Sequence, residues 1–270
     1  MKNSLFWMVL IVGIVALTGS CKKSDDSTAA ATAGCTAVSE CSLAASGSIT
    51  GLDNMSLSGT FNVGTKWSRS LGSVDNTTGC TSQSNLVSGF SSNNGLPEGT
   101  AAFTIKRVVT SPSSFAQIWN AYSDTSRSSE IATIGISYID VTVGDNVTGL
   151  TSSQNTDFSA SVGTTGTKVT YKESCTKGKA TTDAGTTWLN LFMGDSSITW
   201  TTGTEQLCQG NQESYYSLWH VDNSSMLPNS SDGWDNVTNE MFFEYVSKTG
   251  YPTDWDISDH DMSVFPELNP

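Results

Sequence analysis

The densest group of metal-ligand side chains lies near the C-terminal end of the sequence, in the stretch DWDISDHD at residues 254–261. Carboxylates are hard oxygen ligands of the kind that Ca²⁺ prefers. The stretch lacks the central glycine and the bidentate glutamate of an EF-hand loop, and Trp255 and Ile257 alternate with acidic residues as in an edge strand. We therefore expect a solvated acidic strand or loop, with a calcium site as the alternative and no other cofactor. The ligands of that site would be Asp254, Asp256, Asp259 and Asp261.

Two histidines, His220 and His260, are the only imidazoles that could serve as the base of a serine hydrolase. No G-x-S-x-G motif accompanies them, and His220 lies in a strand-like segment, where we expect an ordinary strand histidine. The cysteines show no C-x-x-C spacing, which argues against a zinc cluster. We therefore expect no catalytic residue, and a hydrolase ranks last among the functions considered.

Cys21 follows a segment that is typical of exported proteins. Lys2 precedes an uncharged apolar run over residues 5–17, and Leu17-Thr18-Gly19-Ser20 leads directly into the cysteine. A helix of thirteen residues spans about 20 Å, which is short of the roughly 30 Å hydrocarbon core of a bilayer. The segment therefore predicts a signal peptide rather than a transmembrane helix.

The stretch LTGSC at residues 17–21 resembles the lipobox of bacterial lipoproteins, with Leu17 four residues before Cys21 instead of the usual three, as in spirochaete lipoboxes. The resemblance implies that Cys21 becomes the first residue of the mature protein and carries a diacylglycerol. Two or more acyl chains give durable membrane attachment. The alternative is an ordinary secretory signal that is cut after Ser20.

The charge of the chain excludes some partners. Residues 1–20 hold one lysine and no acid, so the chain from Cys21 carries 12 basic and 26 acidic side chains and a net charge of −14. Nucleic acid is therefore not an expected partner. An anionic membrane repels such a domain, so attachment depends on the lipid and on Lys22 and Lys23. We expect a lipid-anchored protein of the bacterial cell envelope, on the outer membrane or cell surface, with a protein or small-molecule partner left open.

The remaining cysteines predict disulfides, because an exported protein meets an oxidising compartment. With Cys21 acylated, five are left, and an odd number cannot all pair within one chain. We expect a Cys175–Cys208 bridge across a hairpin and a Cys35–Cys41 bridge that closes a small loop, with Cys80 free or exchanging.

Hydropathy divides the chain into a signal peptide at residues 1–20, a flexible tether at 21–46 and a single β-rich domain at 47–270. In the domain, apolar and polar residues alternate as in half-buried strands. The expected strands cover residues 55–63, 102–109, 131–143, 167–174, 187–193, 197–201 and 214–221.

Two short helices are expected among these strands. Ser111 and Pro112 can begin one that buries Phe115, Ile118, Trp119 and Tyr122, and Asn236 can cap another that buries Val237, Met241 and Tyr245. The segment 188–200 is expected to form a hairpin that turns at Gly194 and Asp195. The fold class is therefore mainly β, an antiparallel barrel or sandwich with two short helices.

The aromatic residues of the second half leave three functions open. They form either a solid core or the lining of a cavity for a small apolar or sugar ligand. The sequence thus favours a non-catalytic structural or interaction lipoprotein, with a lipocalin-like carrier second and a hydrolase third. The aromatic residues concerned are Trp188, Trp200, Tyr216, Trp219, Trp234 and Trp255.

Overall fold

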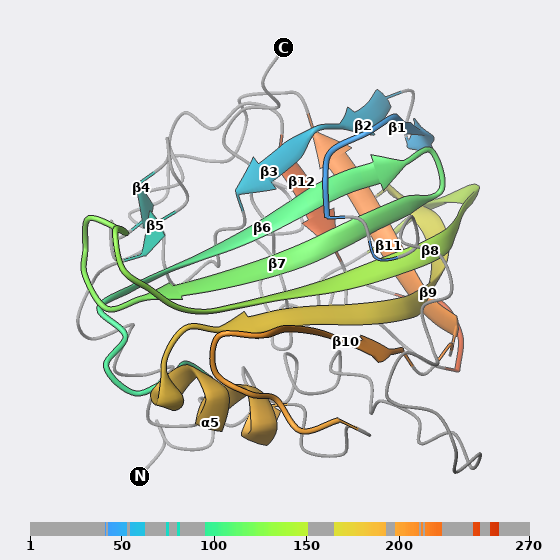
Figure 1. Cartoon of the computed structure of the whole chain (residues 1–270). Coiled ribbons are helices and arrows are strands. Elements are labelled where there is room, and N and C mark those ends of the chain that lie inside the picture. Colours follow the sequence, from blue (N-terminus) through green and yellow to red (C-terminus); the bar gives the residue numbers. More distant parts are fainter. Residues whose placement is uncertain are drawn as a thin grey trace, which may run out of the picture.

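The computed structural model describes residues 41, 43–52, 55–62, 74–75, 80–81, 95–150, 165–192, 198–210, 212, 214–222, 240–243 and 249–253. Its elements are strands with one short helix, so the expected mainly β, antiparallel class is confirmed (Figure 1). In chain order they are β1 (Ser48–Leu52), β2 (Met55–Ser58), β3 (Thr60–Asn62), β4 (Val74–Asp75), β5 (Cys80–Thr81), β6 (Ala102–Ser111), β7 (Ser114–Tyr122), β8 (Glu130–Thr148), β9 (Thr165–Ala180), α5 (Asp183–Phe192), β10 (Glu205–Gln209), β11 (Ser214–Asp222) and β12 (Glu240–Phe243).

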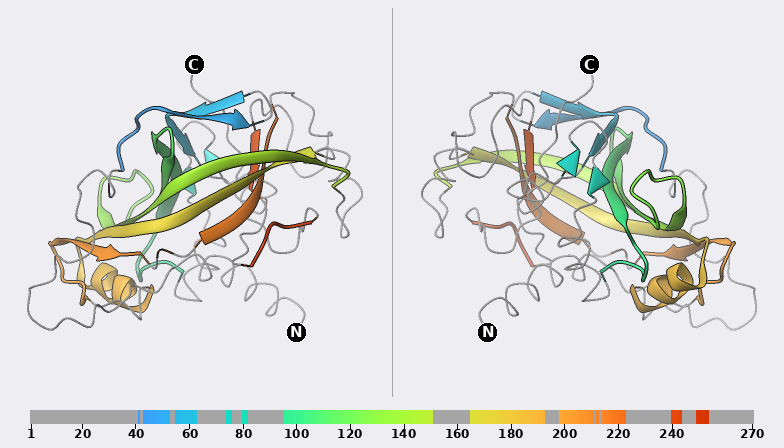
Figure 2. Two further views of the ribbon diagram at one scale, coloured as in Figure 1. Left: turned by 90° about the vertical axis from the view of Figure 1, so that its right-hand side faces the viewer. Right: turned by 90° about the vertical axis from the view of Figure 1, so that its left-hand side faces the viewer.

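One large antiparallel sheet holds ten of the strands. Its order is β12-β11-β9-β8-β7-β6-β5-β4, with β10 added on β9 and β3 added on β6. Strands β1 and β2 form a separate hairpin, which lies at the opposite end of the curved sheet from α5 (Figure 2). Within the described part of the chain no pairing joins β4 to β12, so this sheet is not a closed barrel.

The two faces of the sheet differ in character. The core face carries apolar residues that are in register across the strands, such as Ile105 of β6, Trp119 of β7 and Ile134 of β8. The outer face carries the residues between them, such as Lys106 and Lys177. Alternate side chains of a strand point to opposite faces, and this separates a buried set from a half-exposed polar set.

Helix α5 covers one end of the core face. The hydroxyl oxygen of Thr182 accepts a hydrogen bond from the backbone N–H of Gly185 at 3.1 Å, as an N-cap residue does. The helix buries Trp188 and Leu189, and the ring of Phe192 lies 5.7 Å from that of Trp119. The hairpin expected for residues 188–200 and the strand expected for 187–193 are therefore wrong.

The sequence pattern over α5 fits a strand as well as a helix, which explains why a strand was predicted there. Trp188 and Phe192, four positions apart, would share one face of a strand as well as one face of a helix, yet the side chain of Asn190 serves the helix. Its amide donates to the Thr186 carbonyl at 2.9 Å, while its oxygen accepts from the backbone N–H of Trp200 at 2.9 Å. Asn190 thus fastens the returning chain to the helix.

The helix expected from Ser111 onward is also wrong, because β7 occupies that segment. Phe115 and Trp119 are spaced for one helical face, but they are equally spaced for one face of a strand. They lie on the core face, and Ile118 lies half-buried on the outer face. The Ser111 hydroxyl oxygen accepts a hydrogen bond from the N–H of Ser113, at 3.1 Å, in a hairpin turn instead of capping a helix.

The second expected helix is contradicted over Glu240–Phe243, which form β12 and pair with β11. Asn236, Val237 and Tyr245 lie outside the described residues. β12 is short, so its four residues show no period long enough to separate a strand from a helical turn.

Gly178 provides a test of the core packing. A Cβ atom at Gly178 would lie 2.7 Å from Cζ3 of Trp200, whose ring is 1% exposed and has no room to move outward. We predict that Gly178→Ala lowers the free energy of unfolding by about 1–3 kcal/mol through overpacking. Urea denaturation followed by tryptophan fluorescence measures this change.

Gly144→Ala is the matched control, because a Cβ at Gly144 would make an ordinary contact of 3.5 Å with Lys168. We expect it to change the free energy by no more than about 0.5 kcal/mol. Equal unfolding midpoints for the two variants would contradict the packing of Trp200 on Gly178.

Candidate functional site

A cluster of five aromatic rings fills the core face near the bend of the sheet. Phe115 stacks on Tyr138 with ring centroids 4.7 Å apart, and Tyr171 meets Tyr138 edge-on at 5.3 Å. Tyr215 and Trp219 of β11 complete the cluster, 5.8 and 6.0 Å from the Tyr171 ring. Each ring is at most 5% exposed. Edge-to-face and offset contacts of this kind add to the stability gained from burial alone.

Two charged side chains are buried with these rings. Glu173 is 0% exposed, and its Oε2 accepts a hydrogen bond from the Tyr215 hydroxyl at 3.3 Å. Arg107 is 6% exposed, and its Nε donates to Oε1 of Gln117 at 2.8 Å. Burying a charge is costly unless hydrogen bonds satisfy it. We therefore take these two buried charges and the rings around them as the candidate site among the described residues.

Glu173 reaches the core face because β9 contains a bulge. Tyr138 pairs with Glu173 while the preceding Ser137 pairs with Cys175, which leaves Ser174 as an extra residue. In a regular strand, Glu173 and Cys175, which are two positions apart, would point to the same face. The bulge instead places Glu173 in the core and Cys175 on the outer face.

The bulge in β9 faces the short segment between the end of β10 at Gln209 and the start of β11 at Ser214. The backbone N–H of Gly210 donates to the Ser174 carbonyl at 2.7 Å, and the side-chain amide of Gln212 donates to the carbonyls of Glu173 and Ser174 at 3.0 and 3.1 Å. A Cβ at Gly210 would lie 2.8 Å from the Glu173 carbonyl oxygen, so glycine is required there. These bonds fix the backbone that carries Glu173.

The electrostatics of the cluster keep Tyr138 protonated. Burial raises the pKa of Tyr138 well above its ordinary value of 10.0, and the Glu173 carboxylate raises it further, followed by Tyr171 and Tyr215. Arg107 acts in the opposite direction. A protonated phenol beside a carboxylate is a hydrogen-bond donor, as the Tyr215 hydroxyl is to Glu173.

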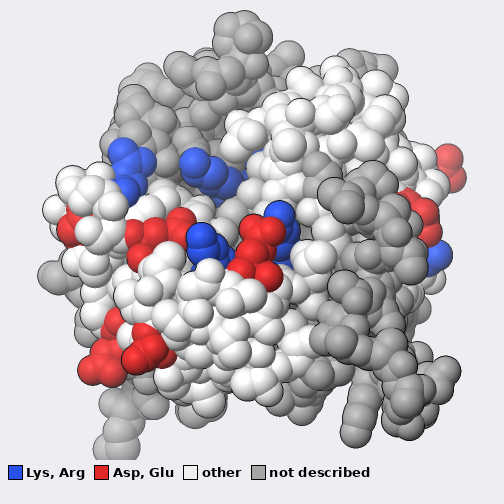
Figure 3. All heavy atoms as spheres, viewed as in Figure 1, with Lys and Arg blue, Asp and Glu red and all other residues white. Residues whose placement is uncertain are grey.

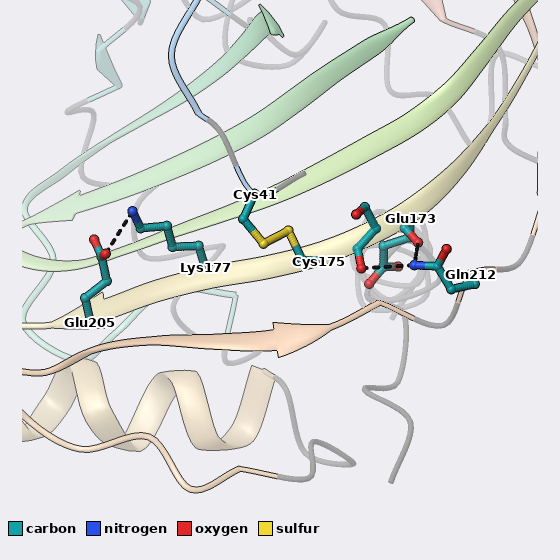
Figure 4. The surroundings of a disulfide bond; sticks show 7 residues. Cys41, Glu173, Cys175, Lys177, Glu205 and Gln212 are labelled. Atoms are coloured by element: carbon teal, nitrogen blue, oxygen red, sulfur yellow. Dashed lines mark hydrogen bonds and ion pairs between the residues drawn. A yellow bond between two sulfur atoms is a disulfide. The ribbon is translucent and has the colours of Figure 1, made fainter. Parts of the chain in front are cut away.

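A disulfide on the outer face joins Cys41 to Cys175 of β9, with Cα atoms 5.8 Å apart (Figure 4). The expected Cys175–Cys208 and Cys35–Cys41 bridges are therefore wrong, because both need a cysteine that is already bonded. Cys208 pairs with Thr176 in the strand register and lies on the core face, opposite to Cys175. Cys208 is also disulfide-bonded.

The chain that follows Cys41 crosses the outer face, and we call residues 41 and 43–47 the strap. The Leu43 side chain occupies the space above Gly135, where a Cβ would lie 2.5 Å from Leu43 Cδ1. Further on, the N–H of Ser46 donates to the Val109 carbonyl of β6 at 2.9 Å. The strap thus runs from β9 across β8 to β6, and the disulfide fixes its first residue.

Most of the sequence-predicted site residues lie elsewhere. Cys21, Cys35 and the expected calcium ligands Asp254, Asp256, Asp259 and Asp261 lie outside the described residues, as do Trp234 and Trp255. Trp188, Trp200 and Trp219 belong to the core, and Tyr216 contacts Tyr251 with ring centroids 5.2 Å apart. Within the described ranges no three potential metal ligands gather.

The buried charges were not predicted, although a signal exists in the sequence. Arg107 stands between Ile105 and Val109, and Glu173 stands two residues after Tyr171, so both occupy the apolar phase of a strand. A charged residue at a strand position that points to the core requires either a buried partner or a shift in strand register.

No model of a known protein family matches the chain, and no curated protein resembles it closely enough to count as a relative. Among the described residues, no helix combines the length and the apolar character needed to cross a bilayer.

The raised pKa of Tyr138 predicts a pH effect on stability. An unfolded tyrosine ionises near pH 10, whereas folded Tyr138 keeps its proton, so its contribution is complete below pH 10 and falls as pH rises further. We expect Tyr138→Phe to make the loss of stability above pH 10 less steep, by up to about 1.4 kcal/mol per pH unit. Urea titrations between pH 8 and 11.5 measure the slope, and identical slopes for wild type and variant would contradict this account.

The disulfide predicts a large effect on stability. It closes a loop with a sequence separation of 134 residues, and a bridge of this reach restricts the unfolded chain. We expect the double variant Cys41→Ala/Cys175→Ala to lose about 2–5 kcal/mol in the free energy of unfolding. A non-reducing peptide map of the wild type is the control, and a linked peptide that joins Cys175 to Cys208 would contradict the structure.

Proposed function

We propose that the protein is an exported bacterial lipoprotein, held in the cell envelope by a lipid on Cys21, whose β domain acts as a non-catalytic structural or interaction module. The observation that carries this proposal is the Cys41–Cys175 disulfide. Disulfides persist in exported proteins and are rare in the cytosol, so the bridge agrees with the export signal of residues 1–20. The outer membrane or the cell surface is the proposed location.

The packing of the core face supports an interaction module over a small-molecule carrier. A carrier needs a chamber lined by aromatic side chains. Here Phe115, Tyr138 and Tyr171 contact one another directly, and each is at most 5% exposed. Ile49 and Leu57 of the β1–β2 hairpin belong to the same apolar cluster, so we further propose a sandwich-like arrangement of hairpin and sheet.

The outer face supports the same proposal, because it offers ordered polar groups to a partner. The amide of half-buried Asn120 donates to the hydroxyl of half-buried Thr133 at 2.6 Å, and the buried Thr104 hydroxyl donates to the Asn120 side-chain oxygen at 3.4 Å and so holds Asn120 in place. These residues form a row across β6, β7 and β8. Polar side chains held by their neighbours lose little conformational entropy when a partner binds.

Intact mass spectrometry of membrane-extracted protein tests the anchor. We predict that the wild type lacks residues 1–20 and carries added acyl chains, and that Cys21→Ala abolishes both changes. Secretion of an unmodified chain cut after Ser20 would contradict the lipoprotein proposal.

Native mass spectrometry of the same preparation tests the role of the domain. A mass that equals the polypeptide plus its acyl chains supports the interaction module. An additional bound small molecule, released on unfolding, would favour the carrier instead.

A further inference from the structure

The basic side chains of the described residues are concentrated on the outer face. Seven lysines and arginines are described, and five of them are lysines whose strand positions point to this face: Lys106, Lys168, Lys172, Lys177 and Lys179. Arg107 is buried on the core face, and Arg127 lies in the β7–β8 loop. Figure 3 shows lysine and arginine side chains across the middle of the face that Figure 1 presents, with acidic side chains beside some of them.

The lysines differ in their pairing. Lys172 and Lys177 form ion pairs with Asp140 and Glu205, at 3.0 and 2.8 Å. Within the described part of the chain, Lys106 and Lys179 form no ion pair, and Lys179 is exposed. The outer face therefore offers positive charge to a partner, although the chain as a whole has a net charge of −13.

The strap places the point where the tether joins the domain, at Cys41, on this same outer face. Cys41 is fixed to Cys175 beside Lys177, and twenty positions along the chain separate it from Cys21. The tether that the composition of these positions predicts would have a root-mean-square span of about 25 Å over this length. A domain of about 225 residues is roughly 45 Å across, so a lipid at the far end of the tether keeps the outer face nearer to the membrane than the core-face side.

We infer that the outer face is turned toward the anionic headgroups of the membrane that holds the lipid, with Lys106, Lys177 and Lys179 as the contacting side chains. This inference rests on the proposed lipid anchor. The acidic remainder of the domain is repelled by an anionic surface, and the lysines are attracted to it, so both forces turn the molecule the same way. Each lysine near such a surface raises the ratio of membrane-facing to outward-facing orientations about fivefold.

The test uses the full-length lipidated protein, reconstituted in vesicles of phosphatidylcholine with or without phosphatidylglycerol. A water-soluble amine-reactive reagent labels accessible lysines, and peptide mass spectrometry measures the extent at each position. We expect labelling of Lys106 and Lys179 to fall about threefold on the anionic vesicles and to recover in 1 M salt, where the Debye length is about 3 Å.

A charge variant separates the surface effect from simple crowding by the vesicle. In Lys106→Gln/Lys179→Gln we expect the protection of Lys177 on anionic vesicles to disappear, because the attracting charge is gone. Arg127→Gln, which also removes a positive charge but from the loop, is the matched control and should leave that protection unchanged. Circular dichroism confirms that both variants fold.

The outcomes distinguish the two proposals. If intact mass shows no acyl chains, the lipoprotein proposal fails and this inference fails with it. If the protein is acylated but labelling of the three lysines is equal on neutral and anionic vesicles, the membrane-facing inference alone is overturned.

Discussion

The sheet depends on one extra residue, Ser174, in the middle of β9. Tyr171 and Glu173 lie on the core face before it and Cys175 lies on the outer face after it, although strict alternation would put Glu173 and Cys175 on one face. The bulge is stabilised by hydrogen bonds from Gly210 and Gln212 across the break between β10 and β11. A single local irregularity therefore supplies the core with its carboxylate and the outer face with its disulfide.

Because β9 pairs with β8 on one side and with β10 and β11 on the other, the effect of the bulge extends over most of the sheet. The aromatic cluster packs around Glu173, and the strap crosses the opposite face from Cys175. The two faces are thus specialised by the same strand. One is closed by aromatic rings and α5, and the other carries the strap and half-buried lysines such as Lys106.

The sequence predicted the long strands well, because β6, β8, β9 and β11 alternate over many residues and few other structures fit such a pattern. It failed at β7 and α5, where Phe115 and Trp119, or Trp188 and Phe192, are spaced in ways that suit both a helix and a strand. There the tertiary contacts decide, and a local pattern does not contain them. The face of Cys175 was beyond prediction for a related reason, since it depends on a bulge that is fixed by residues more than thirty positions away.

The Cys41–Cys175 bridge also constrains how the protein is made. Under the export that we propose, Cys35, Cys41 and Cys80 reach the oxidising side long before Cys175 follows. Cys41 therefore meets earlier thiols first, and any bond it forms with them must be exchanged before the native one can form. Thiol–disulfide exchange takes seconds to hours. The proposed export would therefore tie the maturation of this domain to the disulfide-exchange capacity of the compartment that receives it.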